Sequence, residues 1–124
     1  MMNISKIFGA VAVFLSVVPV QAEESCRAQG GRFFPAQNDA VTVGVTTNAA
    51  GCDRIFRAGG QLMLTSASIV SGPKNGTLSK VGNLSFRYKP KAGYKGADLF
   101  VLKVCGSSRG SSGCSTITHE VRVE

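Results

Sequence analysis

The chain has 124 residues and carries 14 lysines and arginines against 7 aspartates and glutamates, a formal net charge of +7. Once a leader is set aside, this length fits one domain and has no room for a second. Four cysteines, one histidine and few carboxylates also argue against a metal centre or a pair of catalytic acids.

The first residues are predicted to form a secretion signal. Lys6 supplies the positive start, residues 7–18 are apolar, and the sequence Val-Gln-Ala ending at Ala22 predicts cleavage after that residue. An uncleaved membrane anchor is the competing interpretation. Ser16 and Pro19 interrupt the apolar run, which falls short of the roughly 20 residues that span a bilayer.

Cleavage would leave one domain, residues 23–124, with no transmembrane segment. The first cysteine, Cys26, is not at the first mature position, which argues against a lipid anchor. We therefore expect a periplasmic or extracellular protein.

The mature chain begins with a segment whose place in the fold is open. Residues 25–38 are interpreted either as an edge strand or as an exposed contact patch formed by Arg27, Arg32, Phe33 and Phe34. The first clear strand follows, because Val41, Val43 and Val45 alternate with small polar residues, the two-residue period of a half-buried strand.

Turn signals then divide the middle of the chain. Residues 62–70 follow a glycine pair and predict a strand with a bend. Asn75 and Gly76 form a strong two-residue turn signal, which predicts a hairpin between residues 68–71 and 77–81. A second turn at Gly82 and Asn83 leads into a strand that Pro90 closes. The alternating apolar residues of that strand are Leu84, Phe86 and Tyr88.

Two longer strands complete the chain. In residues 99–104 the side chains of Phe100, Leu102 and Val104 share one face, which predicts a central strand facing the core. In residues 116–123 the odd positions point inward. These are Ile117, His119, Val121 and Val123. We interpret His119 as a packing or hydrogen-bonding residue, because no partner constellation for a base or ligand is visible.

Three sequence motifs carry a family resemblance: PKNGTL at residues 73–78, FRYKP at 86–90 and GYKGADLF at 93–100. They resemble the bacterial immunoglobulin-like and cadherin-like repeat domains. The resemblance is clear over residues 62–123 and weak over residues 26–57. It agrees with the fold predicted from the strands, an all-β, antiparallel immunoglobulin-like β-sandwich of about seven strands, braced by disulfides.

Each motif residue has a structural explanation. Tyr94 can bury its ring while its hydroxyl reaches the backbone, and Asp98 can accept bonds from loop amides. Calcium binding by Asp98 is the alternative, but calcium needs six to eight oxygens and the acidic residues are widely spaced. The remaining motif residues are expected to allow unusual backbone angles, at Gly76, Gly93 and Gly96, or to end strands, at Pro73 and Pro90.

The cysteines predict disulfides, and four of them allow three pairings. Cys105 and Cys114 lie at the adjoining ends of two strands across the loop of residues 106–113, so we pair them and, by elimination, Cys26 with Cys52. Zinc would need closer cysteine pairs, and a redox site would need a C-x-x-C motif. The tryptophan and inter-sheet disulfide of antibody domains are absent, so both bridges are expected at edges and hairpin ends.

Basic residues gather in the second half of the chain, where Asp98 is the only acid among them. Arg87, Lys89 and Lys103 have outward parity and predict a basic face that attracts anionic partners. Lysines on exposed strands also suppress edge-to-edge aggregation, which is the simpler explanation. The candidate anion-binding residues are Lys74, Lys80, Arg87, Lys89, Lys91, Lys95 and Lys103.

Three classes of function remain. The first is a noncatalytic module of the cell envelope that binds a macromolecule, either a protein or an anionic polysaccharide, or that has a structural role. The second is a secreted inhibitor that uses the braced loop of residues 106–113. An enzyme is the third, and no catalytic arrangement or cofactor motif supports it. Nucleic acid is not an expected partner, because an export signal removes the protein from the chromosome.

Overall fold

The computed structural model describes residues 25–124, so the predicted signal peptide and its cleavage site lie outside the described residues. The described part holds eight strands and one short 3-10 turn, Pro35–Gln37. The strands are β1 (Cys26–Gln29), β2 (Ala40–Thr47), β3 (Cys52–Ile55), β4 (Leu62–Ser71), β5 (Gly76–Gly82), β6 (Ser85–Pro90), β7 (Gly96–Ser108) and β8 (Ser111–Val123). Within residues 25–124, no helix is long and apolar enough to cross a membrane.

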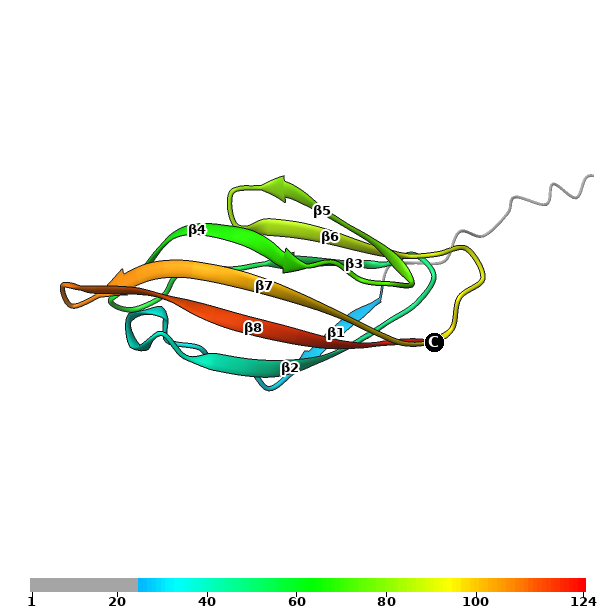
Figure 1. Cartoon of the computed structure of the whole chain (residues 1–124), viewed down its shortest axis with the longest axis horizontal. Helices are drawn as coiled ribbons and strands as arrows, with labels where there is room; N and C mark the ends of the chain where they lie inside the picture. Colours follow the sequence, from blue (N-terminus) through cyan, green and yellow to red (C-terminus); the bar gives the residue numbers. More distant parts are fainter. Residues whose placement is uncertain (1–24) are drawn as a thin grey trace, which may run out of the picture.

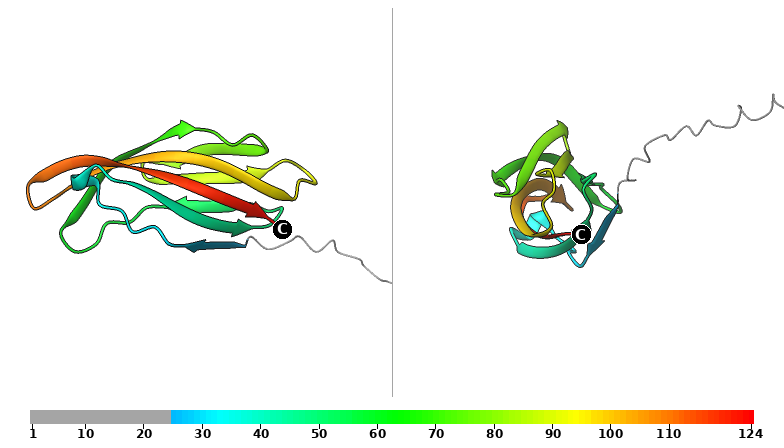
Figure 2. Two further views of the ribbon diagram at one scale, coloured as in Figure 1. Left: turned by 60° about the horizontal axis from the view of Figure 1, so that its bottom comes forward. Right: turned by 90° about the vertical axis from the view of Figure 1, so that its right-hand side faces the viewer.

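The strands form two sheets that pack face to face. One has five strands in the order β1-β2-β8-β7-β4, and the other has three in the order β3-β6-β5. Figure 1 shows β2, β8, β7 and β4 side by side, and the end-on view in Figure 2 shows the strands wrapped around a common core. The predicted immunoglobulin-like sandwich is confirmed. The structure adds an eighth strand and one parallel pair, β2 with β8.

The core follows the parity expected from the sequence. Phe100, Leu102 and Val104 of β7 are each at most 1% exposed, and β7 lies between β8 and β4 as a central strand. The odd residues of β8 and the valines of β2 face the same interior. From the smaller sheet, β6 contributes Phe86 and Tyr88, and the Tyr88 ring stacks on Phe100 with centroids 5.7 Å apart.

His119 packs inside the core as its parity predicts. Its ring stacks on Phe100 with centroids 4.4 Å apart, and Nδ1 lies 3.2 Å from the carbonyl oxygen of Ile117. The other ring nitrogen, Nε2, is buried without a hydrogen-bond partner among the described residues. Burial, with a smaller contribution from the charge of Arg54, lowers the pKa of His119 from 6.5 to about 4. At neutral pH the ring is therefore an uncharged aromatic packing residue.

One predicted hairpin is wrong. Residues 68–71 and 77–81 do not pair, because β4 pairs with β7 in the larger sheet while β5 pairs with β6 in the smaller one. The segment containing Asn75 therefore crosses between sheets. The second predicted turn, at Gly82 and Asn83, does join a hairpin, β5 with β6. The expected bend in the strand of residues 62–70 is a register shift between Leu64 and Ser66.

The prediction of a loop at residues 106–113 is also wrong, because β7 and β8 continue through these residues. Ser108 pairs with Ser111, so only Arg109 and Gly110 form the turn, both with positive φ. Glycine and serine have weak strand preference, which hid this extension in the sequence. The long β7–β8 hairpin projects at the end of the sandwich opposite the C-terminus (Figure 1).

The disulfides join the cysteines in the expected pairs, Cys26 with Cys52 and Cys105 with Cys114. Cys105 and Cys114 are direct cross-strand partners, with Cα atoms 4.0 Å apart. The other bridge links two edge strands, β1 and β3, which belong to different sheets. The expectation that no bridge connects the sheets therefore holds only for the central position used by antibody domains.

The opposite side of the sandwich is closed by side chains. There the edge strands β4 and β5 face each other, and the amine of Lys80 donates to the carbonyl oxygen of Ala67 over 2.6 Å. The side-chain amide of Asn83 donates to the carbonyl oxygen of Thr65 over 3.0 Å. Two backbone acceptors on the free edge of β4 are thus satisfied from the other sheet.

The two bridges should contribute unequally to stability. Replacing Cys26 and Cys52 with serine frees a long loop and separates two sheet edges, which costs about 3.6 kcal/mol in the chain-entropy account. Replacing Cys105 and Cys114 frees a short loop whose strands stay paired, at about 2.7 kcal/mol. Urea unfolding of both double variants should rank them in this order, and the reverse order would contradict the described roles.

The buried His119 should make stability depend on pH. Its folded pKa of about 4 lies below the unfolded value of 6.5, so the unfolded chain binds the proton first as the pH falls through this window. The folded state should lose up to about 3 kcal/mol between pH 7 and pH 4. Urea unfolding at several pH values measures this loss. The H119F variant, which keeps an aromatic ring on Phe100, should lose most of that pH dependence, and an unchanged slope would refute the assignment.

Candidate binding surfaces

The carboxylate of Asp98 organises the end of the sandwich at which the chain terminates. One oxygen accepts the hydroxyl of Tyr88 at 2.7 Å, which connects β7 to β6 in the other sheet. The backbone amides of Lys74 and Asn75, in the β4–β5 connection, also donate to this carboxylate at 3.1 to 3.4 Å. Burial and the bond to Asp98 raise the pKa of Tyr88. The predicted architectural role of Asp98 agrees with these contacts.

The β6–β7 loop is held against the same connection. The hydroxyl of Tyr94 donates to the carbonyl oxygen of Ala97 and accepts the side-chain amide of Asn75 at 3.3 Å. The amide of Lys91 donates to the carbonyl oxygen of Asn75 over 2.9 Å. Two connections far apart in sequence are thereby fixed side by side.

The glycines of the family motifs are required for two different structural reasons. Gly93 and Gly96 have positive φ, as expected. Gly76 does not, and the expectation of an unusual backbone angle there is wrong. A Cβ at Gly76 would lie 2.5 Å from the carbonyl oxygen of Lys89, so this glycine permits a close approach of two strands.

Four of the seven predicted anion-binding residues come together at this end. Lys74 lies in the β4–β5 connection, Lys91 and Lys95 lie in the β6–β7 loop, and Lys89 precedes the last residue of β6. All four are exposed, and none forms an ion pair with a described residue. We call Lys74, Lys89, Lys91 and Lys95 the basic loop end.

The other three predicted residues lie elsewhere. Arg87, on the outer face of the smaller sheet, forms a two-pronged ion pair with Asp53 at 2.8 and 3.1 Å, which lowers the pKa of that carboxyl. Lys80 has inward parity and binds the carbonyl oxygen of Ala67. Lys103 lies on the outer face of the larger sheet, so the structure does not unite it with Arg87 and Lys89 on one face.

The described carboxylates do little to offset the basic loop end. Asp98 is 8% exposed and is fully engaged by its donors, and Asp53 pairs with Arg87. Asp39 binds the amide of Phe34 and the hydroxyl of Ser115. Glu124 lies 3.9 Å from Arg122. Asp39, Asp53 and Asp98 are thus used in contacts within the fold, whereas Glu120 and Glu124 are exposed.

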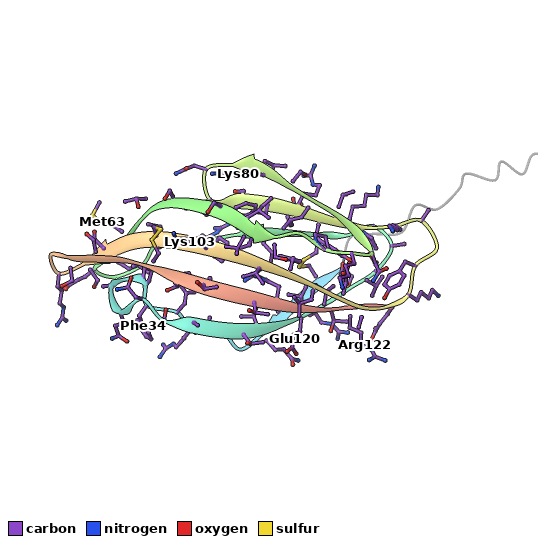
Figure 3. All side chains as sticks on the ribbon, in the orientation of Figure 1. Phe34, Met63, Lys80, Lys103, Glu120 and Arg122 are labelled. Atoms are coloured by element: carbon purple, nitrogen blue, oxygen red, sulfur yellow. A yellow bond between two sulfur atoms is a disulfide. The ribbon has the colours of Figure 1, made fainter. Side chains whose placement is uncertain are left out.

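The opposite end carries an apolar groove. Within residues 25–38, β1 is an edge strand, as one of the two interpretations predicted, and a contact patch at Phe34 stays a prediction. Phe33 packs edge-on against Phe56, whereas Phe34 is 50% exposed beside Pro35. The groove, about 780 Å³, runs between this segment, Leu62 and the β7–β8 turn. Figure 3 shows Phe34 and Met63 near this end.

Sequence reasoning missed a second hollow, on the outer face of the larger sheet. It is about 740 Å³ and crosses the sheet near the basic loop end. We call it the outer-face trough. Its lining includes Gly44, Leu99, Glu120 and Arg122, with Lys74 at one end. Figure 3 shows Glu120 and Arg122 toward the C-terminal end of the sandwich. The signal that could have found it is Gly44, the one glycine inside a valine-threonine strand.

Within the described residues, no three histidine, cysteine, aspartate or glutamate side chains form a group that could hold a metal ion. All four cysteines of the chain are in disulfides. The arrangement can therefore offer surfaces, charges and hydrogen bonds, and we find no assembled set of reactive groups on the part of the chain that is described.

Comparison with protein families agrees with this geometry. The sequence profile of the bacterial Ig domain matches residues 28–121, which is most of the chain, and the protein belongs to this family. Domains of this family are typically noncatalytic. No curated protein matches the chain.

Asp98 and Asp53 allow a matched test of a buried and an exposed carboxylate. The D98N variant keeps the size of the side chain but replaces an acceptor with an amide donor that faces the Tyr88 hydroxyl and backbone amides. It should lower the free energy of unfolding by about 2 kcal/mol. The D53N variant, which removes an exposed ion pair, should cost under about 1 kcal/mol. Equal losses in urea unfolding would contradict the organising role of Asp98.

Proposed function

We propose that this protein is a noncatalytic extracytoplasmic binding module whose basic loop end attaches to an anionic macromolecule of the cell envelope or its surroundings. The observation that carries the proposal is the grouping of Lys74, Lys91 and Lys95 on fixed loops with Lys89 at the adjoining end of β6, without an ion pair to any described carboxylate. Four exposed ammonium groups at one end attract anions over distances near the Debye length, about 10 Å at 0.1 M salt.

The loop geometry supports binding rather than simple solubility. Lysines that only prevent aggregation can point anywhere along an exposed edge. Here Lys74 and Lys91 are adjacent in space because the amide of Lys91 binds Asn75, and Asp98 holds the backbone of Lys74 itself. A prearranged backbone reduces the entropy lost on binding.

Extracytoplasmic residence rests on the two disulfides, which persist in oxidising compartments. The signal sequence predicted for residues 1–22 supports the same location. The noncatalytic part of the proposal rests on family membership.

Salt-dependent retention on immobilised heparin tests the proposal. Replacing Lys89, Lys91 and Lys95 with glutamine should weaken retention roughly tenfold in affinity at 0.1 M salt, because three charge contacts of about 0.5 kcal/mol each are lost. The control removes the same charge from exposed cations elsewhere, with Arg32, Arg57 and Lys103 changed to glutamine. If both triple variants elute together, net charge alone explains retention, and if the wild type is not retained, the proposal fails.

A protein-binding inhibitor is the second candidate, and one observation favours it. The β7–β8 hairpin is a braced ladder rather than a flexible loop, and its turn borders the groove beside Phe34. Rigid projections and exposed aromatic side chains are typical of protein contacts. The side chain of Arg109 at the turn is already engaged within the domain, because its guanidinium donates a hydrogen bond to the side-chain oxygen of Gln61 over 2.6 Å.

A further inference from the structure

Gly44 lies in a place where the fold itself does not need a glycine. It sits inside β2, an internal strand of the larger sheet, where glycine weakens a strand through its backbone freedom and its missing side chain. A Cβ added at Gly44 would meet no atom within 4 Å, and its φ is not in the left-handed region. Neither packing nor backbone geometry therefore requires it. The register of β2 with β1 and β8 is unbroken at Gly44, so a bulge does not explain it either, and the position leaves room for the close approach of an outside molecule.

The surroundings of Gly44 form the outer-face trough. Glu120 on β8 is its cross-strand neighbour, and on the other side Gln29 of β1 is its partner. Thr46 and Ala97, one row further along the sheet, also have small side chains, so the hollow continues toward the basic loop end. The trough crosses several strands and could hold a linear chain.

The chemistry of the trough suits a sugar chain that carries carboxylates. Lys74, which follows the edge strand β4, and Arg122, on the central strand β8, offer positive charge, and the Arg122 side chain is 77% exposed despite its 3.9 Å contact with Glu124. Gln29, Thr46 and Glu120 can exchange hydrogen bonds with hydroxyl groups. Leu99, 46% exposed, offers an apolar surface to the carbon face of a sugar ring.

The carboxylate of Glu120 selects among anions. It lies in the middle of the trough, where it repels a ligand with dense charge such as polyphosphate. A polysaccharide with one carboxylate per sugar can place hydroxyl groups against Glu120 and its carboxylates against Lys74 and Arg122.

We propose that the outer-face trough is a binding site for an acidic polysaccharide of the uronate type, with Gly44 as the floor over which the sugar chain passes. This inference rests on the proposed function and names its ligand class. It also assigns a site distinct from Lys89, Lys91 and Lys95, which can hold any polyanion by charge alone.

The test fills the trough without changing the charge. In the G44Q variant the new side chain extends into open space, so the fold should be kept, as unfolding in urea would verify. Binding to immobilised polygalacturonate at 0.1 M salt should weaken at least tenfold, while retention on polyphosphate should not change. The matched control is G59Q, because Gly59 also has open space around a Cβ and an ordinary φ but lies at the other end of the sandwich.

A second variant guards against misfolding of the first. Changing Arg122, which lies outside the basic loop end, to glutamine should weaken polygalacturonate binding more than the same loss of charge at Arg32. Two outcomes would overturn the assignment of the trough as a binding site and leave the proposed function standing. One is wild-type protein that binds polyphosphate but not polygalacturonate, and the other is a G44Q variant that binds polygalacturonate as the wild type does. Wild-type protein that binds no polyanion would overturn both.

Discussion

The buried carboxylate of Asp98 is the contact on which the rest of this domain depends. It joins the two sheets through Tyr88, fixes the β4–β5 connection through two backbone amides, and caps its own strand through the amide of Leu99. Charge-assisted bonds of this kind are strong when they are buried. Because Tyr94 and Lys91 attach the β6–β7 loop to Asn75, the positions of both connections follow from one residue.

The use of carboxylates in contacts within the fold also explains how charge is distributed over the surface. The domain uses Asp98, Asp39 and Asp53 for internal or lateral contacts, which leaves its lysines to set the field outside. A net charge of +7 is therefore not spread evenly over the molecule. The positive charge is most available where the loops are best fixed, and this combination of rigidity and charge supports the binding that we propose for the basic loop end.

Much of the fold could be predicted from the sequence, and the failures have physical causes. The parity of β8 and the core face of β7 were readable because a two-residue period survives wherever one face is buried. The prediction of a hairpin at Asn75 and Gly76 was wrong because turn signals report only local sequence. The strand that pairs with β4 is β7, which lies distant in sequence. The strand extension through residues 106–113 carries no hydrophobic signal at all.

The candidate sites were less predictable than the fold. Grouping of lysines depends on which connections meet, so Lys74 joined Lys91 while Lys103 and Arg87 fell on opposite sheets. Outward parity alone could not show this. Gly44 was visible in the sequence, but its meaning depends on the empty space above it, which only the packed sheet reveals.

Lys80 illustrates how one residue type serves two purposes. Counted among the cations, it looked like part of an anion site, yet its amine satisfies a carbonyl on the free edge of β4, next to the carbonyl that Asn83 satisfies. An exposed, uncharged edge strand is a template on which foreign strands can add. By occupying these acceptors from the neighbouring sheet, the domain guards its longest open edge against such strand addition. The domain can therefore reach a high local concentration without polymerising through that edge.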